Sequence, residues 1–229
     1  SFSVAGLRKG LDDPRGNLML TFLAIAERYR PEWLVWENVP GVLSSDGGRD
    51  FGALLGGLGQ LGYGFAYRIL DAQYFGVAQR RRRVFVVANA RSWRRTAAVL
   101  FERESLSGHP APRRETREGT ADKIDDGIAE VCGALSDGAH MGGGLNGQDA
   151  YTGRIFPSIT DGMKVRRLTP RECERLQGFA DDYTLIPYRN KPAADGPRYK
   201  ALGNSMAVPV MAWIGKRIDM VNNLADEHK

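Results

Sequence analysis

The sequence predicts an α/β fold, in which helices cross over between the strands of a sheet. Residues 17–30 carry apolar side chains at helical spacing, and Pro31 follows them. The run from Trp33 to Trp36 is short, apolar and continuous, which is typical of a buried parallel strand. Because helical and strand patterns alternate as far as Asn89, we expect a sheet with helices between its strands.

A second helix is predicted between residues 51 and 61, where Phe51 and four leucines recur on one side. Four glycines inside this segment weaken the prediction, since a glycine within a helix costs about 1 kcal/mol relative to alanine. Residues 65–70 and 84–87 have the composition of strands, and a loop through Gly76 separates them.

Residues 90–164 show no sustained periodicity and include the run Gly142–Gly144. They form either a small second domain of loops and short strands or a partly disordered insertion. Regular structure returns at Thr169, which can cap a helix that has Pro170 in its first position. A last helix is expected from about Val208, because apolar side chains recur there at helical spacing.

The distribution of charge says more than the net charge of +5. Arginines gather in short segments, as expected of a surface that binds phosphates. These segments include 80–83, 94–95, 113–114 and 166–167. Composition alone supports an ordinary solvated basic surface equally well.

The cysteines and histidines show no metal-site spacing. The three histidines lie in loop-like or terminal sequence, and nothing joins Cys132 to Cys173. We interpret Cys173 as a small packing residue and give Cys132 no catalytic role. Two cysteines suit a reducing cytoplasm, and no apolar run is long enough to cross a bilayer.

Glu37 is a candidate for ligand recognition. It comes directly after the apolar strand, and open α/β sheets place their ligand crevice at the carboxyl ends of strands. A carboxyl group there can accept from the exocyclic amine of a nucleobase and, when protonated, donate to a ring nitrogen. Taken alone, the tripeptide Glu37–Val39 is more simply the end of a strand in solvent.

A run of arginines precedes the last strand predicted before Asn89. Alternate residues of a strand face the same way, so Arg81 and Arg83 should share a face with Gln79. Arg80 and Arg82 should point elsewhere. The alternative is a basic strand that contacts phosphates without specificity, and that alternative also makes nucleic acid the partner.

The tripeptide Gly203-Asn204-Ser205 precedes the last predicted helix. Glycine lets the backbone approach a ligand closely, and the polar pair offers donors at the start of a helix. Taken alone, the tripeptide is a common helix cap.

In their order and spacing, five segments together resemble the C5-cytosine DNA methyltransferases. The segments are Ser1–Gly10, Glu37–Val39, Gln79–Arg83, Arg167–Phe179 and Gly203–Ser205. The resemblance covers residues 1–89 and 165–229, and the motifs are specific as an ordered set.

This resemblance implies a Rossmann-like sheet of S-adenosylmethionine-dependent methyltransferases, with N-terminal strands missing and a small irregular target-recognition insertion. It divides the chain into a partial catalytic domain (1–89), a target-recognition region (90–164) and a return to the catalytic domain (165–229). It also implies the reaction. A cysteine thiolate adds to C6 of a cytosine flipped out of the duplex, C5 takes the methyl group of S-adenosylmethionine, and β-elimination frees the enzyme.

The resemblance further assigns roles to individual residues. Glu37 would steady the edge of the cytosine, and Arg81 and Arg83 would orient the base and the catalytic loop. Asn204 and Ser205 would contact the methionine part of S-adenosylmethionine. DNA contacts are expected at Ser3, Arg8, Lys9, Arg15 and Gln79.

The resemblance implies that the chain is a fragment. In the family, the segment that matches Ser1–Gly10 directly follows a Pro-Cys-Gln motif, whose cysteine attacks the base. We therefore expect the isolated chain to lack the nucleophile and most of the S-adenosylmethionine pocket, and to be inactive by itself. The alternatives are a half-enzyme completed by another chain and a non-catalytic DNA-binding relic.

The expected partners follow from the same resemblance. They are double-stranded DNA and the missing N-terminal portion or a complementing chain. The complete enzyme is expected to be a cytoplasmic monomer of the restriction-modification type, without metal and without membrane association.

Overall fold

The computed structural model of the chain describes residues 18–102, 158–161 and 164–226, which form two compact units. The first unit contains the described residues 18–70, 82–102 and 213–226. The second unit contains the described residues 71–81, 158–161 and 164–212. The functional bounds expected at residues 89 and 164 do not coincide with these units, and they remain a prediction.

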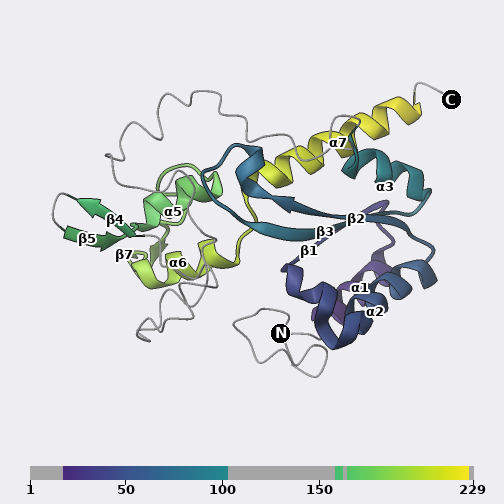
Figure 1. Cartoon of the computed structure of the whole chain (residues 1–229), viewed down its shortest axis with the longest axis horizontal. Coiled ribbons are helices and arrows are strands. Elements are labelled where there is room, and N and C mark those ends of the chain that lie inside the picture. Colours follow the sequence, from purple (N-terminus) through teal and green to yellow (C-terminus); the bar gives the residue numbers. More distant parts are fainter. Residues whose placement is uncertain (1–17, 103–157, 162–163, 227–229) are drawn as a thin grey trace. The chain divides into compact units, whose positions relative to one another are not determined.

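A three-stranded sheet lies at the centre of the first unit (Figure 1). Its strands are β1 (Trp33–Asn38), β2 (Gly64–Asp71) and β3 (Arg82–Asn89), and β3 lies between the other two. β1 and β3 are antiparallel, with Trp33 opposite Asn89 and Asn38 opposite Val84. The expectation of a parallel strand at Trp33 is therefore wrong for this pair. Helices cover both faces, so an antiparallel strand here also has a continuous apolar sequence.

Helices cover both faces of this sheet (Figure 1). α1 (Leu18–Tyr29) and α2 (Arg49–Gln60) lie on one face, and α3 (Trp93–Leu100) and the later part of α7 (Val208–Asp226) lie on the other. The 3-10 segment η2 (Pro40–Gly48) connects β1 to α2. The core beneath α1 and α2 is built from apolar side chains of both helices and the sheet. They include Met19, Ala26, Leu34, Trp36, Leu54, Leu58, Val84, Val86 and Ala88.

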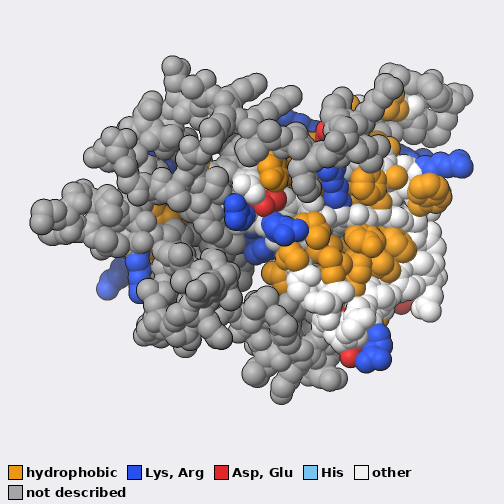
Figure 2. Space-filling model, in the orientation of Figure 1, with side chains coloured by type: hydrophobic (Ala, Val, Ile, Leu, Met, Phe, Trp, Pro, Cys, Tyr) orange, Lys and Arg blue, Asp and Glu red, His pale blue; other side chains and the backbone are white. Residues whose placement is uncertain are grey.

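The first unit also leaves apolar surface uncovered. Figure 2 shows hydrophobic side chains gathered over the region of the sheet. The exposed large hydrophobic residues of the unit include Leu18, Ile25 and Tyr29 of α1 and Tyr67 of β2. None of the helices in the described ranges is long and apolar enough to cross a membrane.

The second unit is held together by a smaller core. It contains η3 (Ala72–Phe75), α5 (Pro170–Gln177), α6 (Asp195–Asn204) and the two-stranded pairs β4 (Ser158–Asp161) with β5 (Lys164–Arg167) and β6 (Pro187–Tyr188) with β7 (Lys191–Pro192). Thr169 and Glu172 form a capping box at the start of α5, which confirms the predicted cap. Leu168, Cys173 and Leu202 form the centre of this core. Cys173 is buried there, as the sequence predicted.

The segment after Asn89 holds more structure than its sequence indicated. α3 begins at Trp93, and the side chain of Ser92 caps it by accepting from the backbone N–H of Arg94 at 3.2 Å. We expected no regular element there, because α3 has only eight residues and two of them are arginines. Thr96, Val99 and Leu100 are nevertheless buried, so packing rather than length stabilises this helix.

Candidate functional site

Glu37 and Arg83 form an ion pair on one face of the sheet in the first unit. Glu37 Oε1 lies 3.1 Å from Arg83 Nε. The strand register explains this contact, because Glu37 is directly opposite Phe85, and Arg83 lies two residues from Phe85 on the same face. Glu37 was expected to follow the apolar strand. Instead, β1 extends to Asn38, and Glu37 is its penultimate residue.

The ion pair is largely withdrawn from solvent. The side chains of Glu37 and Arg83 are 19% and 15% exposed. Burial lowers the pKa of the Arg83 guanidinium, and the charge of Glu37 and its hydrogen bond with Arg83 oppose that shift. Arg83 also donates to the carbonyl oxygen of Arg82 at 2.8 Å, which fixes the orientation of the guanidinium. The pair therefore presents a fixed carboxylate at the carboxyl end of β1.

The turn that follows β1 is built by its own side chains. The Asn38 side-chain oxygen accepts from the backbone N–H of Val39 at 2.8 Å. Pro40 then begins η2, and its fixed φ suits the first position of a helical segment. These contacts hold the exit of β1, next to Glu37, in one conformation.

Exposure alternates along residues 79–83, which confirms the predicted alternation. Gln79 and Arg81 are buried and Arg83 is half-buried, whereas Arg80 and Arg82 are exposed. Since β3 begins only at Arg82, the alternation extends into the segment before the strand.

Arg81 is engaged within the second unit. Its Nη2 donates to the carbonyl oxygens of Gly203 at 3.1 Å and of Ser205 at 2.6 Å. Its backbone N–H donates to Asp71 Oδ1 at 2.9 Å, and Asp71 also accepts from the side chain of Gln73 at 2.8 Å. The guanidinium of Arg81 thus ties the segment before β3 to the tripeptide at 203–205.

That tripeptide ends a helix instead of starting one. α6 runs through Asn204, Ser205 is its C-cap, and α7 begins at Val208. The tripeptide does precede the last helix and includes a cap, as predicted, but Ser205 caps the end of α6, so the expected donors at a helix start are not found there. No strong sequence signal indicated α6. The hydroxyl of Ser205 donates back to the Leu202 carbonyl at 2.9 Å, while the side chain of Asn204 is exposed.

Gln177 is a supporting residue that the sequence did not reveal. Its fully buried side chain donates to the Leu202 carbonyl at 2.7 Å. With Arg81, it satisfies backbone carbonyls at the carboxyl end of α6, where a helix leaves acceptors unpaired. The matching segment Arg167–Phe179 suggested a structural helix, but spacing alone could not indicate which carbonyl Gln177 meets.

Gln79, expected to contact DNA, is fully buried. Neither of its side-chain amide atoms has a hydrogen-bond partner among the residues described. In this conformation the amide of Gln79 does not reach a surface. The other expected DNA contacts, Ser3, Arg8, Lys9 and Arg15, lie outside the described residues.

The described ranges contain no group of three His, Cys, Asp or Glu side chains that could hold a metal ion. Cys132 and the three histidines, His109, His140 and His228, lie outside those ranges. The expected absence of a metal therefore remains a prediction.

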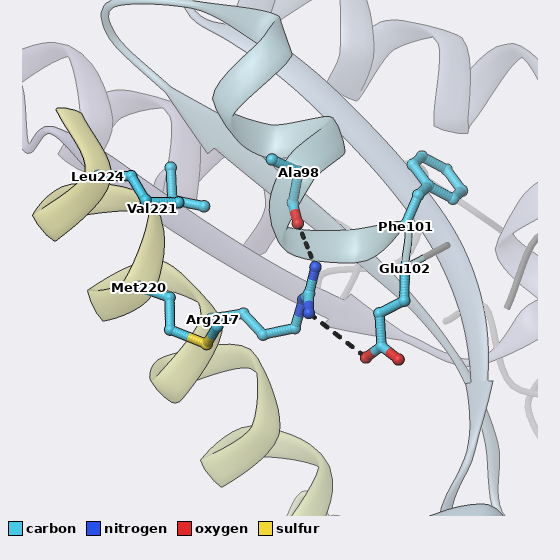
Figure 3. A pocket seen from close by; sticks show the side chains of 7 residues that line it. All are labelled: Ala98, Phe101, Glu102, Arg217, Met220, Val221 and Leu224. Carbon is cyan, nitrogen blue, oxygen red and sulfur yellow. Dashed lines mark hydrogen bonds and ion pairs between the residues drawn. The ribbon is translucent and has the colours of Figure 1, made fainter. Parts of the chain in front are cut away.

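A separate pocket of about 330 Å³ lies between the end of α3 and α7 in the first unit (Figure 3). Arg217 extends across it and donates to the carbonyl oxygen of Val99 at 2.5 Å and to that of Ala98. Arg217 also pairs with Glu102 at 3.6 Å. Because its guanidinium caps the carboxyl end of α3, we assign this pocket a structural role.

Comparison with known proteins identifies the family. The model of the C-5 cytosine-specific DNA methylase family matches residues 1–130 and 139–220. The DNA N-6-adenine-methyltransferase of Escherichia phage P1 is 32% identical over 95% of this chain and 51% of its own length. Type II methyltransferase M.SsoII of Shigella sonnei is 32% identical over 95% of this chain and 61% of its own. M.HpaII of Haemophilus parainfluenzae is 30% identical over 99% and 71%.

Solved structures share the fold. The Entamoeba histolytica methyltransferase EhMeth matches 92% of this chain and 70% of its own with a TM-score of 0.59 and 16% identity. The S. pombe Dnmt2 methyltransferase matches 95% and 74% with a TM-score of 0.59 and 18% identity. These likenesses confirm the predicted Rossmann-like methyltransferase fold class.

The chain belongs to the C-5 cytosine-specific DNA methylase family. It spans about half of the phage relative and about seven-tenths of M.HpaII.

Proposed function

We propose that this chain forms part of an enzyme that transfers a methyl group from S-adenosylmethionine to C5 of a cytosine in double-stranded DNA. Family membership supports the reaction class. The observation that carries the proposal is the Glu37–Arg83 pair at the carboxyl end of β1. Open α/β sheets place their ligands at that end of a strand.

In this proposal Glu37 reads the edge of the target cytosine. Its carboxylate accepts a hydrogen bond from the exocyclic amine, and on protonation it donates to the ring nitrogen. Arg83 orients the carboxylate and brings its own charge close to the base. A carboxylate held in this way needs little reorganisation when the base arrives, which is how an enzyme favours a transition state.

The tripeptide Gly203-Asn204-Ser205 fits a contact to the amino-acid part of S-adenosylmethionine, the methyl donor of this reaction. The exposed Asn204 amide offers donors to a carboxylate, and the Ser205 oxygen can accept from an ammonium group. Arg81 and Gln177 hold the backbone on which both side chains stand. We propose Arg81 as a residue that acts chiefly by positioning this turn.

DNA recognition is proposed for the remaining segments. Residues 90–164 serve as the target-recognition region between the two catalytic segments, 1–89 and 165–229. Ser3, Arg8, Lys9 and Arg15 supply phosphate contacts, and Gln79 contacts DNA after a rearrangement that exposes it.

The proposal is tested by replacing Glu37 with glutamine in a full-length or complemented enzyme. Glu37→Gln keeps the shape and one acceptor but removes the group that binds and releases a proton. A hydrogen bond to a charged group contributes about 1.5–3 kcal/mol, so we expect the methylation rate to fall roughly 10- to 150-fold while DNA affinity stays unchanged. Glu32→Gln is the matched control, because it removes another ion-paired carboxylate of the same unit.

The product should be analysed for both 5-methylcytosine and N6-methyladenine, since the phage relative is named for adenine methylation. Parental turnover by Glu37→Gln would reduce Glu37 to a structural residue. Exclusive N6-methyladenine would overturn the cytosine assignment, and DNA binding without either product would favour a non-catalytic role.

A further inference from the structure

The second unit contains a short hairpin whose residues are all exposed. β6 and β7 pair antiparallel, with Pro187 opposite Pro192 and Tyr188 opposite Lys191. The two residues between them, Arg189 and Asn190, both have positive φ, at 51° and 60°. Two left-handed residues in a two-residue loop define a type I′ turn, whose twist matches that of the flanking strands. Arginine is disfavoured at positive φ, so the residue preferences of this turn do not explain why an arginine stands at position 189.

A partner would contact the side chains of this hairpin and not the edges of its strands. Every residue from Leu185 to Pro192 is exposed. Proline has no N–H to donate, and each short strand carries one, so the edges are poorly suited to pairing with a further strand.

The tip of the hairpin carries an aromatic ring and two cationic side chains. Tyr188 is 65% exposed, and the Arg189 guanidinium carbon lies 5.2 Å from the centre of its ring. Lys191 is directly opposite Tyr188 across the ladder, where side chains of neighbouring strands are adjacent. One cation therefore contacts the exposed ring, and the second lies at the paired position of the neighbouring strand.

These cations differ from the arginines of the helix nearby in sequence. Arg171 pairs with Asp182, and Arg175 pairs with Asp181 at 2.6 Å. Within the described residues, no carboxylate pairs with Arg189 or Lys191. The segment from Leu185 to Pro192 contains no acidic residue at all. The hairpin thus carries a local charge of +2 that no carboxylate of the described residues neutralises.

We propose that this hairpin is a contact surface for duplex DNA. Arg189 and Lys191 bind backbone phosphates, and the ring of Tyr188 packs against the sugar-phosphate backbone. The choice of DNA as the anionic partner rests on the function proposed above. A phosphate contact of this kind fixes the position of the duplex and carries no sequence information. The contact lies outside the residues assigned to the chemistry, so it should affect binding and not turnover.

The test uses Arg189→Gly combined with Lys191→Gln in a full-length or complemented enzyme. Glycine suits the positive φ at position 189, so the turn is kept while the charge is removed. Binding of a labelled duplex is measured by fluorescence anisotropy over a series of salt concentrations. Because each lost phosphate contact lowers the slope of log K against log salt by about 0.9, we expect the slope to become shallower by about 2. The methylation rate at saturating DNA should match that of the parent.

The matched control is Arg171→Ala combined with Arg175→Ala, which changes the net charge by the same amount at arginines already paired with acids. It should leave the slope close to the parental value. Tyr188→Ala should weaken binding without changing the slope, and Tyr188→Phe should behave like the parent.

An unchanged slope in the hairpin variant would overturn the proposal and leave an acidic protein surface as the partner of matching charge. Equal changes in the hairpin and control variants would also overturn it, because they would indicate a general effect of charge. A parent that binds DNA through this hairpin but forms no methylated product would refute the proposed function and leave the contact standing.

Discussion

Arg83 and Glu37 need each other's charge more than the two residues of an exposed ion pair do. Both side chains are largely buried, so removing one partner leaves the other charge poorly solvated, which costs more than the pair itself contributes. The ion pair with Arg83 gives the Glu37 carboxylate a defined orientation. The neighbouring Arg82 has no such constraint, since its side chain is exposed.

This difference predicts that Arg83 and Arg82 respond differently to alanine. Arg83→Ala in a full-length or complemented enzyme should lower the methylation rate at saturating DNA by roughly 10- to 100-fold, because Glu37 loses its orienting partner. Arg82→Ala should leave that rate unchanged and at most weaken DNA binding. Single-turnover kinetics and a salt-dependent binding series separate the two effects. A normal rate for Arg83→Ala would exclude this arginine from the site.

At the scale of single residues, the sequence predicted which way a side chain faces but not which group it contacts. Alternation predicted correctly that Arg81 and Arg83 differ from Arg80 and Arg82. It could not predict that Arg81 meets two carbonyl oxygens at the end of α6, because α6 lies more than a hundred residues away. The same limit applies to Gln177, whose role depends on where α6 ends.

At the scale of elements, strong periodicity predicted structure well and weak periodicity did not. α1, α2 and α7 were predicted within a few residues, because apolar side chains recur at helical spacing in each sequence. α3 and α6 were missed because they are short and rich in polar residues or glycine. The direction of β1 relative to β3 was also missed, because burial on both faces conceals whether a strand is parallel.

Two glycines of the first unit should respond oppositely to alanine. At Gly64, the first residue of β2, an added Cβ would lie 2.4 Å from the backbone nitrogen of Trp93. Backbone cannot yield as a flexible side chain can, so Gly64→Ala should lower the free energy of unfolding by about 1–3 kcal/mol. Gly56 lies inside α2 with nothing within 4 Å of an added Cβ, so Gly56→Ala should raise the free energy of unfolding by up to about 1 kcal/mol.

Urea unfolding followed by circular dichroism measures both changes. Gly57→Ala gives an intermediate case, since the added Cβ would meet the end of the Leu23 side chain, which can move. If Gly64→Ala were as stable as the parent, the close approach of β2 to the start of α3 would be incorrect.

At the scale of the whole molecule, the modest net positive charge does not reveal which charged side chains are paired and which are exposed. In the second unit Glu174, Asp181 and Asp182 pair with arginines, while Arg189 and Lys191 are exposed and pair with no carboxylate of the described residues. The most buried match is between Glu174 and Arg198, whose charged atoms lie 3.0 Å apart. Composition could indicate the number of charges but not this division between interior and surface.

Glu174 should make the stability of the chain depend on pH. Burial by itself raises the pKa of this carboxyl, but hydrogen bonds from Thr184, Arg198 and the backbone N–H of Asp182 outweigh burial, so the pKa lies below its ordinary value of 4.5. A carboxyl whose pKa is lower when folded stabilises the fold above its ordinary pKa, and this contribution disappears as the pH falls through the folded value.

We therefore expect Glu174→Gln to lower the free energy of unfolding by about 3 kcal/mol at pH 7, because Arg198 is left buried without its closest carboxylate. The difference from the parent should shrink as the pH falls below 4.5, since protonation of Glu174 then removes the same charge from the parent. Urea unfolding at several pH values measures this difference. Glu27→Gln, at an exposed position of α1, is the control and should match the parent at every pH. A Glu174→Gln deficit that stayed constant down to pH 3 would show that packing, and not the charge of Glu174, stabilises this unit.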